Sequence, residues 1–180
     1  MSPPSELDAW LRAAQKGDQA AFAQVFDHCY GTMYRYALKW SGNVADAEDI
    51  TQVASIKLAK SIGQFQFDAA FTTWLYRLVV NTAIDWQRSN QRHHPVAQAE
   101  TIEPETGDSQ AGFNGVLLQQ LIARVAELGE GFREAVILVL GEGFSHREAA
   151  EVLAVQESTI SWRIHQVRKV LTEQLGGDHE

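Results

Sequence analysis

The sequence lacks most features of secreted, membrane-spanning and metal-binding proteins. Its 180 residues include one cysteine, Cys29, which cannot form a disulfide within the chain. No apolar run is long enough to cross a bilayer, and the first residues lack the basic-then-apolar order of a secretory signal. We therefore expect a soluble protein of the cytoplasm. Metal-ligand spacing of Cys and His, a glycine-rich phosphate loop and a Ser/His/Asp set are also missing, so we expect no cofactor, metal, small-molecule substrate or catalysis.

Basic residues are scarce overall but unevenly distributed. The chain has 23 Asp and Glu against 15 Lys and Arg, a formal net charge of -8, which argues against a general nucleic-acid coat. Residues 1–93 carry nine basic and nine acidic residues, residues 94–115 none and four, and residues 116–180 six and ten. Between Ser158 and Leu171, however, three basic residues occur with no acidic residue. This segment can therefore form a local DNA-reading face within an acidic protein.

Hydrophobic periodicity predicts two helical lobes. Strand-like alternation and internal repeats are missing from the sequence. Residues 94–115 contain two prolines, three glycines and few large apolar side chains, which is typical of a linker. We predict an all-α fold of two small helical domains, residues 1–93 and 116–180, joined by a flexible acidic linker at 94–115, with a helix-turn-helix in the second domain.

The helix-turn-helix is predicted by a helix-start motif and an apolar stripe. Ser145 and Glu148 form a capping box, in which each side chain satisfies a backbone donor at a helix start. After a short break at "AVQ", apolar residues recur at i, i+4, i+7 and i+11 from Ile160 to Leu171, so that stripe faces inward. The opposite face and its flanks, suited to a major groove, carry Ser158, Thr159, Ser161, Trp162, Arg163, His165, Gln166, Arg168 and Lys169. The alternative is a helical hairpin with an ordinary solvated face, against which an exposed tryptophan argues.

The N-terminal lobe contains a candidate protein-docking helix. In "DAEDITQVASIKLAKSIGQF" the residues Ala47, Ile50, Ala54, Leu58 and Ser61 form an inward stripe. The other side carries carboxylates, an amide and an exposed isoleucine, namely Glu48, Asp49, Gln52 and Ile56. This combination favours docking on another protein. The alternative is a solvated helix with one stray apolar residue.

An aromatic loop precedes a third helix and suggests binding of single-stranded DNA. The loop "GQFQFDAAFTTW" leads into "TTWLYRLVVNTAIDWQRSNQR", which is apolar almost all round except for an edge with Arg77, Asn81, Asp85 and Arg88. Unstacked bases stack on rings such as Phe65 and Phe67 while cations hold phosphates. The alternative is an aromatic core formed by Phe65, Phe67, Phe71 and Trp74.

Three segments together resemble a known family. "DAEDITQ", "FTTWLYRLVVNTAIDWQR" and "FSHREAAEVLAVQESTISWRIHQVRKVL" resemble, in order and spacing, regions 2 and 4 of extracytoplasmic-function sigma factors of bacterial RNA polymerase. The resemblance implies that Asp49 and Gln52 grip the clamp helices of the largest polymerase subunit. It also implies that residues 63–69 capture a flipped base of the −10 element. The polar edge from Arg77 to Arg88 would lie on the helix that contacts the −10 element, and residues 157–170 would form the helix that reads the −35 element. Trp162 stands where the family usually has a small residue.

The resemblance implies a function with several partners. We expect a sigma factor that binds core RNA polymerase at its clamp helices and flap region, recognises −10 and −35 promoter DNA, and is held by an anti-sigma factor. Residues 94–115 would replace the family's region 3. Two alternatives remain: a sigma-mimicking decoy that binds an anti-sigma factor without DNA, and a stand-alone helix-turn-helix repressor. Binding to core polymerase separates the first reading from both.

Overall fold

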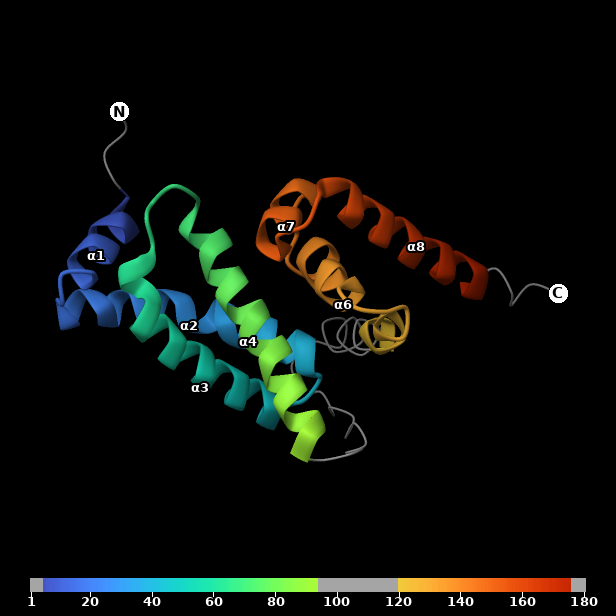
Figure 1. Cartoon of the computed structure of the whole chain (residues 1–180), viewed down its shortest axis with the longest axis horizontal. Helices are drawn as coiled ribbons and strands as arrows, with labels where there is room; N and C mark the ends of the chain where they lie inside the picture. The colour runs from blue at the N-terminus through green and yellow to red at the C-terminus, as the bar shows by residue number, and fades with distance from the viewer. Residues whose placement is uncertain (1–4, 94–119, 176–180) are drawn as a thin grey trace, which may run out of the picture. The chain divides into compact units, whose positions relative to one another are not determined.

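The computed structural model describes residues 5–93 and 120–175, and the chain divides into two compact units, Met1–Glu100 and Thr101–Glu180 (Figure 1). Over the described ranges the regular structure is helical throughout, which confirms the all-α prediction. The predicted linker, residues 94–115, lies outside the described residues. None of the helices described is both long and apolar enough to cross a membrane.

Between residues 5 and 93 the first unit contains four α-helices, α1 (Glu6–Ala14), α2 (Gln19–Ser41), α3 (Val44–Ser61) and α4 (Phe71–His93), with a 3₁₀ turn, η1 (Ile62–Gln64), after α3. Polar side chains start the first three helices: Ser5, Asp18 and Asn43 each accept a hydrogen bond from a backbone N–H three residues on. Because these caps satisfy backbone donors that lack a helical partner, they fix where each helix begins.

The core of the first unit lies between α2, α3 and α4. Figure 1 shows α2 and α3 running alongside each other with α4 crossing them. Fully buried side chains come from all three helices, for example Met33 of α2, Ile50 of α3 and Val79 of α4. Cys29 of α2 is also fully buried, and burial raises the pKa of its thiol to about 12. Cys29 is therefore an unreactive core residue.

The second unit is built around the predicted helix-turn-helix. Residues 120–126 are helical and precede α6 (Phe132–Val136), a π-helical turn η2 (Ile137–Gly141), α7 (His146–Leu153) and α8 (Glu157–Leu175). The capping box is present at the start of α7: the Ser145 hydroxyl accepts from the Glu148 N–H, and the Glu148 carboxylate accepts from the Ser145 N–H. The prediction of a helix starting there is confirmed.

The turn between α7 and α8 is tight. Ala154 ends α7 in the left-handed conformation, with φ +53°, and the Val155 N–H donates to the Ala150 carbonyl at 3.1 Å. The predicted inward stripe of α8 is confirmed for Ile160, Ile164 and Val167, which are buried, as are Ile137 and Leu138 of η2, whereas its fourth member, Leu171, is only half-buried. This packing fixes which face of α8 points away from the core.

Candidate protein-docking and nucleic-acid interfaces

The outer face of α3 has the polar and apolar side chains that the sequence predicts. Glu48, Asp49 and Gln52 are exposed, and Ile56 is 51% exposed. Val53 is 38% exposed and extends the apolar part of this surface. The inward stripe is buried as predicted, except that Ser61 is only half-buried and Thr51 joins the stripe, with its hydroxyl donating to the Ala47 carbonyl. The structure thus leaves an apolar and acidic strip open to solvent, which suits protein docking.

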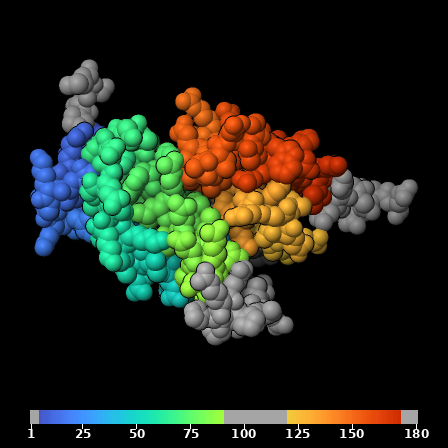
Figure 2. Space-filling model, in the orientation of Figure 1, coloured from blue at the N-terminus to red at the C-terminus, as the bar shows by residue number. Residues whose placement is uncertain are grey.

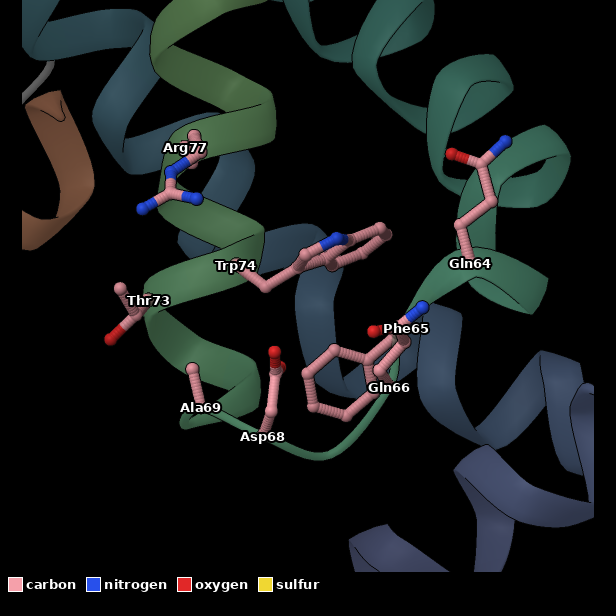
Figure 3. Close-up of a pocket in the computed structure, with 8 residues that line it drawn as sticks. All are labelled: Gln64, Phe65, Gln66, Asp68, Ala69, Thr73, Trp74 and Arg77. Carbon is pink, nitrogen blue, oxygen red and sulfur yellow. The ribbon is translucent and has the colours of Figure 1, made fainter.

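A pocket lies where the aromatic loop meets α4. Its volume is about 240 Å³, and its lining comes from the loop and the first two turns of α4 (Figure 3): Gln64, Phe65, Gln66, Asp68, Ala69, Thr73, Trp74 and Arg77. In Figure 3 the Asp68 carboxylate points toward the Trp74 indole, and Arg77 lies one turn further along α4. The pocket therefore combines a stacking surface, hydrogen-bond acceptors and a cation, the groups that hold an unstacked base.

The aromatic rings of this loop divide between core and surface. Phe65 is 5% exposed and packs against Phe71 and Trp74, with ring centroids 5.2 and 5.8 Å apart. The aromatic-core alternative is therefore confirmed for Phe65 and Phe71, although the Phe65 ring still forms part of the pocket wall. Phe67 and Trp74 are only half-buried. Of these two rings, Trp74 lines the pocket beside Phe65 and leaves more of its surface exposed than Phe65 does, whereas Phe67 is not among the lining residues.

The polar edge of α4 is exposed over its whole length. Arg77, Asn81, Asp85 and Arg88 recur at i, i+4, i+8 and i+11 and are all exposed, as the sequence predicts. Asp85 is ion-paired: its Oδ2 lies 3.0 Å from Lys57 Nζ of α3. Because both side chains are well exposed, this pair contributes little to stability. The Lys57 ammonium does, however, neutralise the charge of Asp85, the one carboxylate on this edge, which would otherwise repel phosphates.

The outer face of α8 matches most of the predicted reading face. Ser158, His165, Arg168 and Lys169 are exposed, and Trp162 is 54% exposed. Thr159, Ser161 and Gln166 are half-buried on its flanks. The Ser161 hydroxyl lies 2.9 Å from His146 Nδ1 at the start of α7, so it joins the two helices of the motif.

Trp162 and Arg163 both lie against α6, which the sequence did not predict. The Trp162 ring meets the Phe132 ring edge-on, with centroids 5.4 Å apart, and the Arg163 guanidinium lies 6.0 Å from the same ring. A Cβ at Gly131 would lie 2.5 Å from Arg163 Cζ, and Gly131 has φ +82°. Only glycine therefore fits at this position without displacing Arg163. The Arg163 side chain is half-buried and packs within the unit, whereas Arg168 and Lys169 are exposed.

The described residues contain no group of three or more His, Cys, Asp or Glu side chains placed to hold a metal ion. Among the carboxylates of the described residues, only that of Glu148 has a shifted pKa. The hydrogen bonds from the Ser145 hydroxyl and N–H lower this pKa. That carboxylate caps α7 and is a structural group.

Comparisons with known proteins identify the family. Two family descriptions match this chain: Sigma-70 region 2 over residues 25–93 and Sigma-70, region 4 over residues 118–171. The ECF RNA polymerase sigma factor SigW of Bacillus subtilis is 31% identical over 176 residues, covering 92% of this chain and 94% of that protein. This chain belongs to the ECF sigma factors. Other members are also similar: SigM of Mycobacterium tuberculosis is 33% identical, covering 94% and 85% of the two chains, and sigma-E of Escherichia coli is 30% identical, covering 89% and 90%.

Solved structures share the fold of this sigma factor. CnrH, solved with the cytosolic domain of CnrY, has a TM-score of 0.69 at 22% identity and covers 94% of this chain and 97% of its own. The sigma factor RpoE of Bartonella quintana, solved with the anti-sigma factor NepR, has a TM-score of 0.68 at 24% identity and covers 88% and 98%. These two structures support the fold, and the family descriptions and the 31% identity to SigW confirm the resemblance inferred from the sequence motifs.

Sequence reasoning missed the part that α1 plays in this sigma factor. The Gln15 amide, directly after α1, donates to the Ile62 and Phe65 carbonyls at 2.9 and 2.7 Å. The Arg12 guanidinium lies 3.9 Å from the centre of the Phe67 ring. These contacts join residues about 50 positions apart, so no local pattern could have indicated them.

Proposed function

We propose that this sigma factor docks on the clamp helices of core RNA polymerase through Glu48, Asp49, Gln52 and Ile56. The proposal is supported by the exposure of a large apolar side chain among carboxylates along one side of α3. Apolar contact would supply affinity, and the carboxylates would select a basic partner surface and speed association. The flap region of polymerase is the expected partner of the second unit.

The −10 element is read as single-stranded DNA by the loop and α4. The observation that carries this proposal is the pocket of about 240 Å³ bounded by Trp74, Asp68 and Arg77. Extruding a base from the duplex costs a few kcal/mol, and stacking it on a ring recovers about 1–3 kcal/mol. Arg77 and Arg88 lie along the exposed edge of α4, where cations would follow the phosphate backbone.

The −35 element is read as duplex by the outer face of α8. Ser158, Trp162 and His165 are exposed on this face and would meet base edges in the major groove. Arg168 and Lys169, further along the helix, would contact phosphates and so position the helix without reading sequence. Thr159, Ser161, Arg163 and Gln166 flank this surface and orient it.

The two lobes are weak DNA binders that act together. Residues 116–180 carry six basic and ten acidic residues, a net charge of 6 - 10 = -4, so phosphate attraction alone gives little affinity. Docking on polymerase first would hold both lobes at a fixed separation and raise their effective concentration at the promoter. The protein would thus act in the cytoplasm as a specificity subunit, without catalysing a reaction itself. An anti-sigma factor is the expected inhibitor, since the structural relative RpoE was solved with one.

Competition for core polymerase tests the docking surface. We expect Asp49→Arg and Gln52→Ala to weaken binding to core enzyme, because both side chains lie on the exposed side of α3. Asp27→Arg on α2 is the matched control, because Asp27 is also exposed and this substitution makes the same charge change elsewhere on the unit. Equal affinities for Asp49→Arg and Asp27→Arg would rule out this surface.

A further inference from the structure

Gln15 makes two hydrogen bonds to the segment that leads into the pocket loop. Its side-chain Nε2 donates to the carbonyl of Ile62, at the start of η1, and to the carbonyl of Phe65, directly after η1. A glutamine amide has two N–H donors, so both are used on this one turn. The contact fixes the two ends of η1 relative to α1, and Phe65 also lines the pocket.

Arg12 adds a second contact from the same side of α1. It precedes Gln15 by three residues, so both side chains lie on one face of the helix. The Arg12 guanidinium stands 3.9 Å from the centre of the Phe67 ring, and the Phe67 ring in turn lies 4.7 Å from that of Phe65. Arg12 thus holds the far side of the loop through a cation–π contact.

The middle of the loop, residues 66–69, has a strained backbone with few hydrogen bonds to hold it. Phe67 has φ +59°, a left-handed conformation that bulky side chains rarely adopt. Among the described residues, the N–H groups of residues 66–69 take part in no backbone hydrogen bond. A disfavoured conformation persists only where its surroundings determine it; here Arg12 and the Phe65 ring contact Phe67, and Gln15 holds the Phe65 carbonyl.

We propose that Gln15 and Arg12 are positioning residues that preform the pocket for an extruded promoter base. The inference rests on the proposed function of the loop, and it extends that function to α1, which precedes the matched region 2 at residues 25–93. A loop already held in its binding shape loses less conformational freedom when the base arrives, so affinity rises without any contact between α1 and DNA.

Binding of single-stranded promoter DNA to the holoenzyme tests the proposal. The probe is a labelled non-template strand oligonucleotide that spans the −10 element of a promoter used by the wild-type holoenzyme. A set of oligonucleotides with one abasic site each identifies the pocket base as the position whose removal weakens wild-type binding. We expect Gln15→Ala to weaken binding of the intact oligonucleotide about tenfold, as two lost hydrogen bonds would. The same variant should have no effect on the oligonucleotide that is abasic at the pocket position.

Arg12 gives a graded version of the same test. We expect Arg12→Ala to weaken intact-strand binding about two- to fivefold and Arg12→Lys to restore it, because lysine keeps a cation over the Phe67 ring. Lys16→Ala is the matched control: Lys16 is exposed, adjacent and basic, and removing it should leave binding unchanged. Circular dichroism and core polymerase affinity should be the same for all these variants.

The outcomes separate this inference from the function on which it rests. If Gln15→Ala weakens binding to the intact and the abasic strand equally, α1 does not act through the pocket and the inference is overturned. Loss of helicity or of core affinity in Gln15→Ala would overturn it as well, because Gln15 would then support the fold of the unit. If no abasic position weakens wild-type binding, base capture itself is wrong.

Discussion

Replacing Trp162 by alanine tests both promoter reading and packing within the second unit. The ring is 54% exposed, yet it packs edge-on against Phe132 at 5.4 Å. Trp162→Ala therefore removes a surface that would meet the major groove and one aromatic contact within the unit. It leaves the buried stripe of Ile160, Ile164 and Val167 intact.

The two losses have different expected sizes. An edge-on aromatic pair contributes about 0.5–1.5 kcal/mol beyond its buried area, so we expect the free energy of unfolding to fall by about 1–2 kcal/mol with the unit still folded. A lost base contact costs about 1–3 kcal/mol at the base concerned and nothing at other positions. We therefore expect Trp162→Ala to change which −35 sequences are used.

The assay is transcription from a library of −35 sequences by holoenzymes that carry each variant, with a fold check by circular dichroism. Trp162→Phe is the matched control, because phenylalanine keeps a ring beside Phe132 while shortening the surface offered to DNA. Unfolding of the second unit by Trp162→Ala would mean that the ring is a core residue. An unchanged −35 preference in a folded variant would refute base reading by Trp162 and favour contact with a protein partner.

Three further predictions concern the pocket, the phosphate contacts and the cap of α7. Asp68 can only accept hydrogen bonds, so it favours an extruded base with an exocyclic amine, and Asp68→Asn should reduce discrimination against thymine in oligonucleotide binding. Arg168→Ala and Lys169→Ala should weaken all promoters about equally and lower the salt slope by about one unit in titrations of holoenzyme binding, whereas a change in sequence preference would contradict phosphate contact. The Ser145 hydroxyl and N–H lower the pKa of Glu148 from its ordinary value of 4.5, so the cap stabilises the folded state fully above that value, and the stabilisation is lost as the pH falls through the lowered pKa. The thermal midpoint of Glu148→Ala should thus lie below that of wild type at pH 7, and the gap should shrink at pH 3.5; an equal gap at both would contradict the cap.

The helices of this protein were predictable because their signals are local. The capping box at Ser145 and Glu148 and the 3.6-residue stripe of α8 each depend on residues a few positions apart, and the structure has both. The exposed faces of α3 and α4 followed from the same periodicity. Helix rotation is thus fixed once the apolar stripe is identified.

The finer details of the sites depend on contacts between distant segments, which periodicity does not encode. Phe65 has the sequence context of an exposed loop ring, but it is buried because Phe71 and Trp74 close over it from α4. Arg163 is placed by the sequence on the reading face and its flanks, and in the structure its guanidinium lies beside Gly131 and Phe132 at the start of α6. In each case tertiary packing decides between roles that the side chain alone leaves open.

Run-off transcription with purified core RNA polymerase tests the central claim most directly. The protein is added to core enzyme on a library of genomic promoter fragments, with core enzyme alone as the control. We predict transcripts that start at defined sites and depend on both the protein and matching −10 and −35 elements. A protein that forms no complex with core enzyme, or a complex that initiates no more specifically than core enzyme alone, would contradict the account.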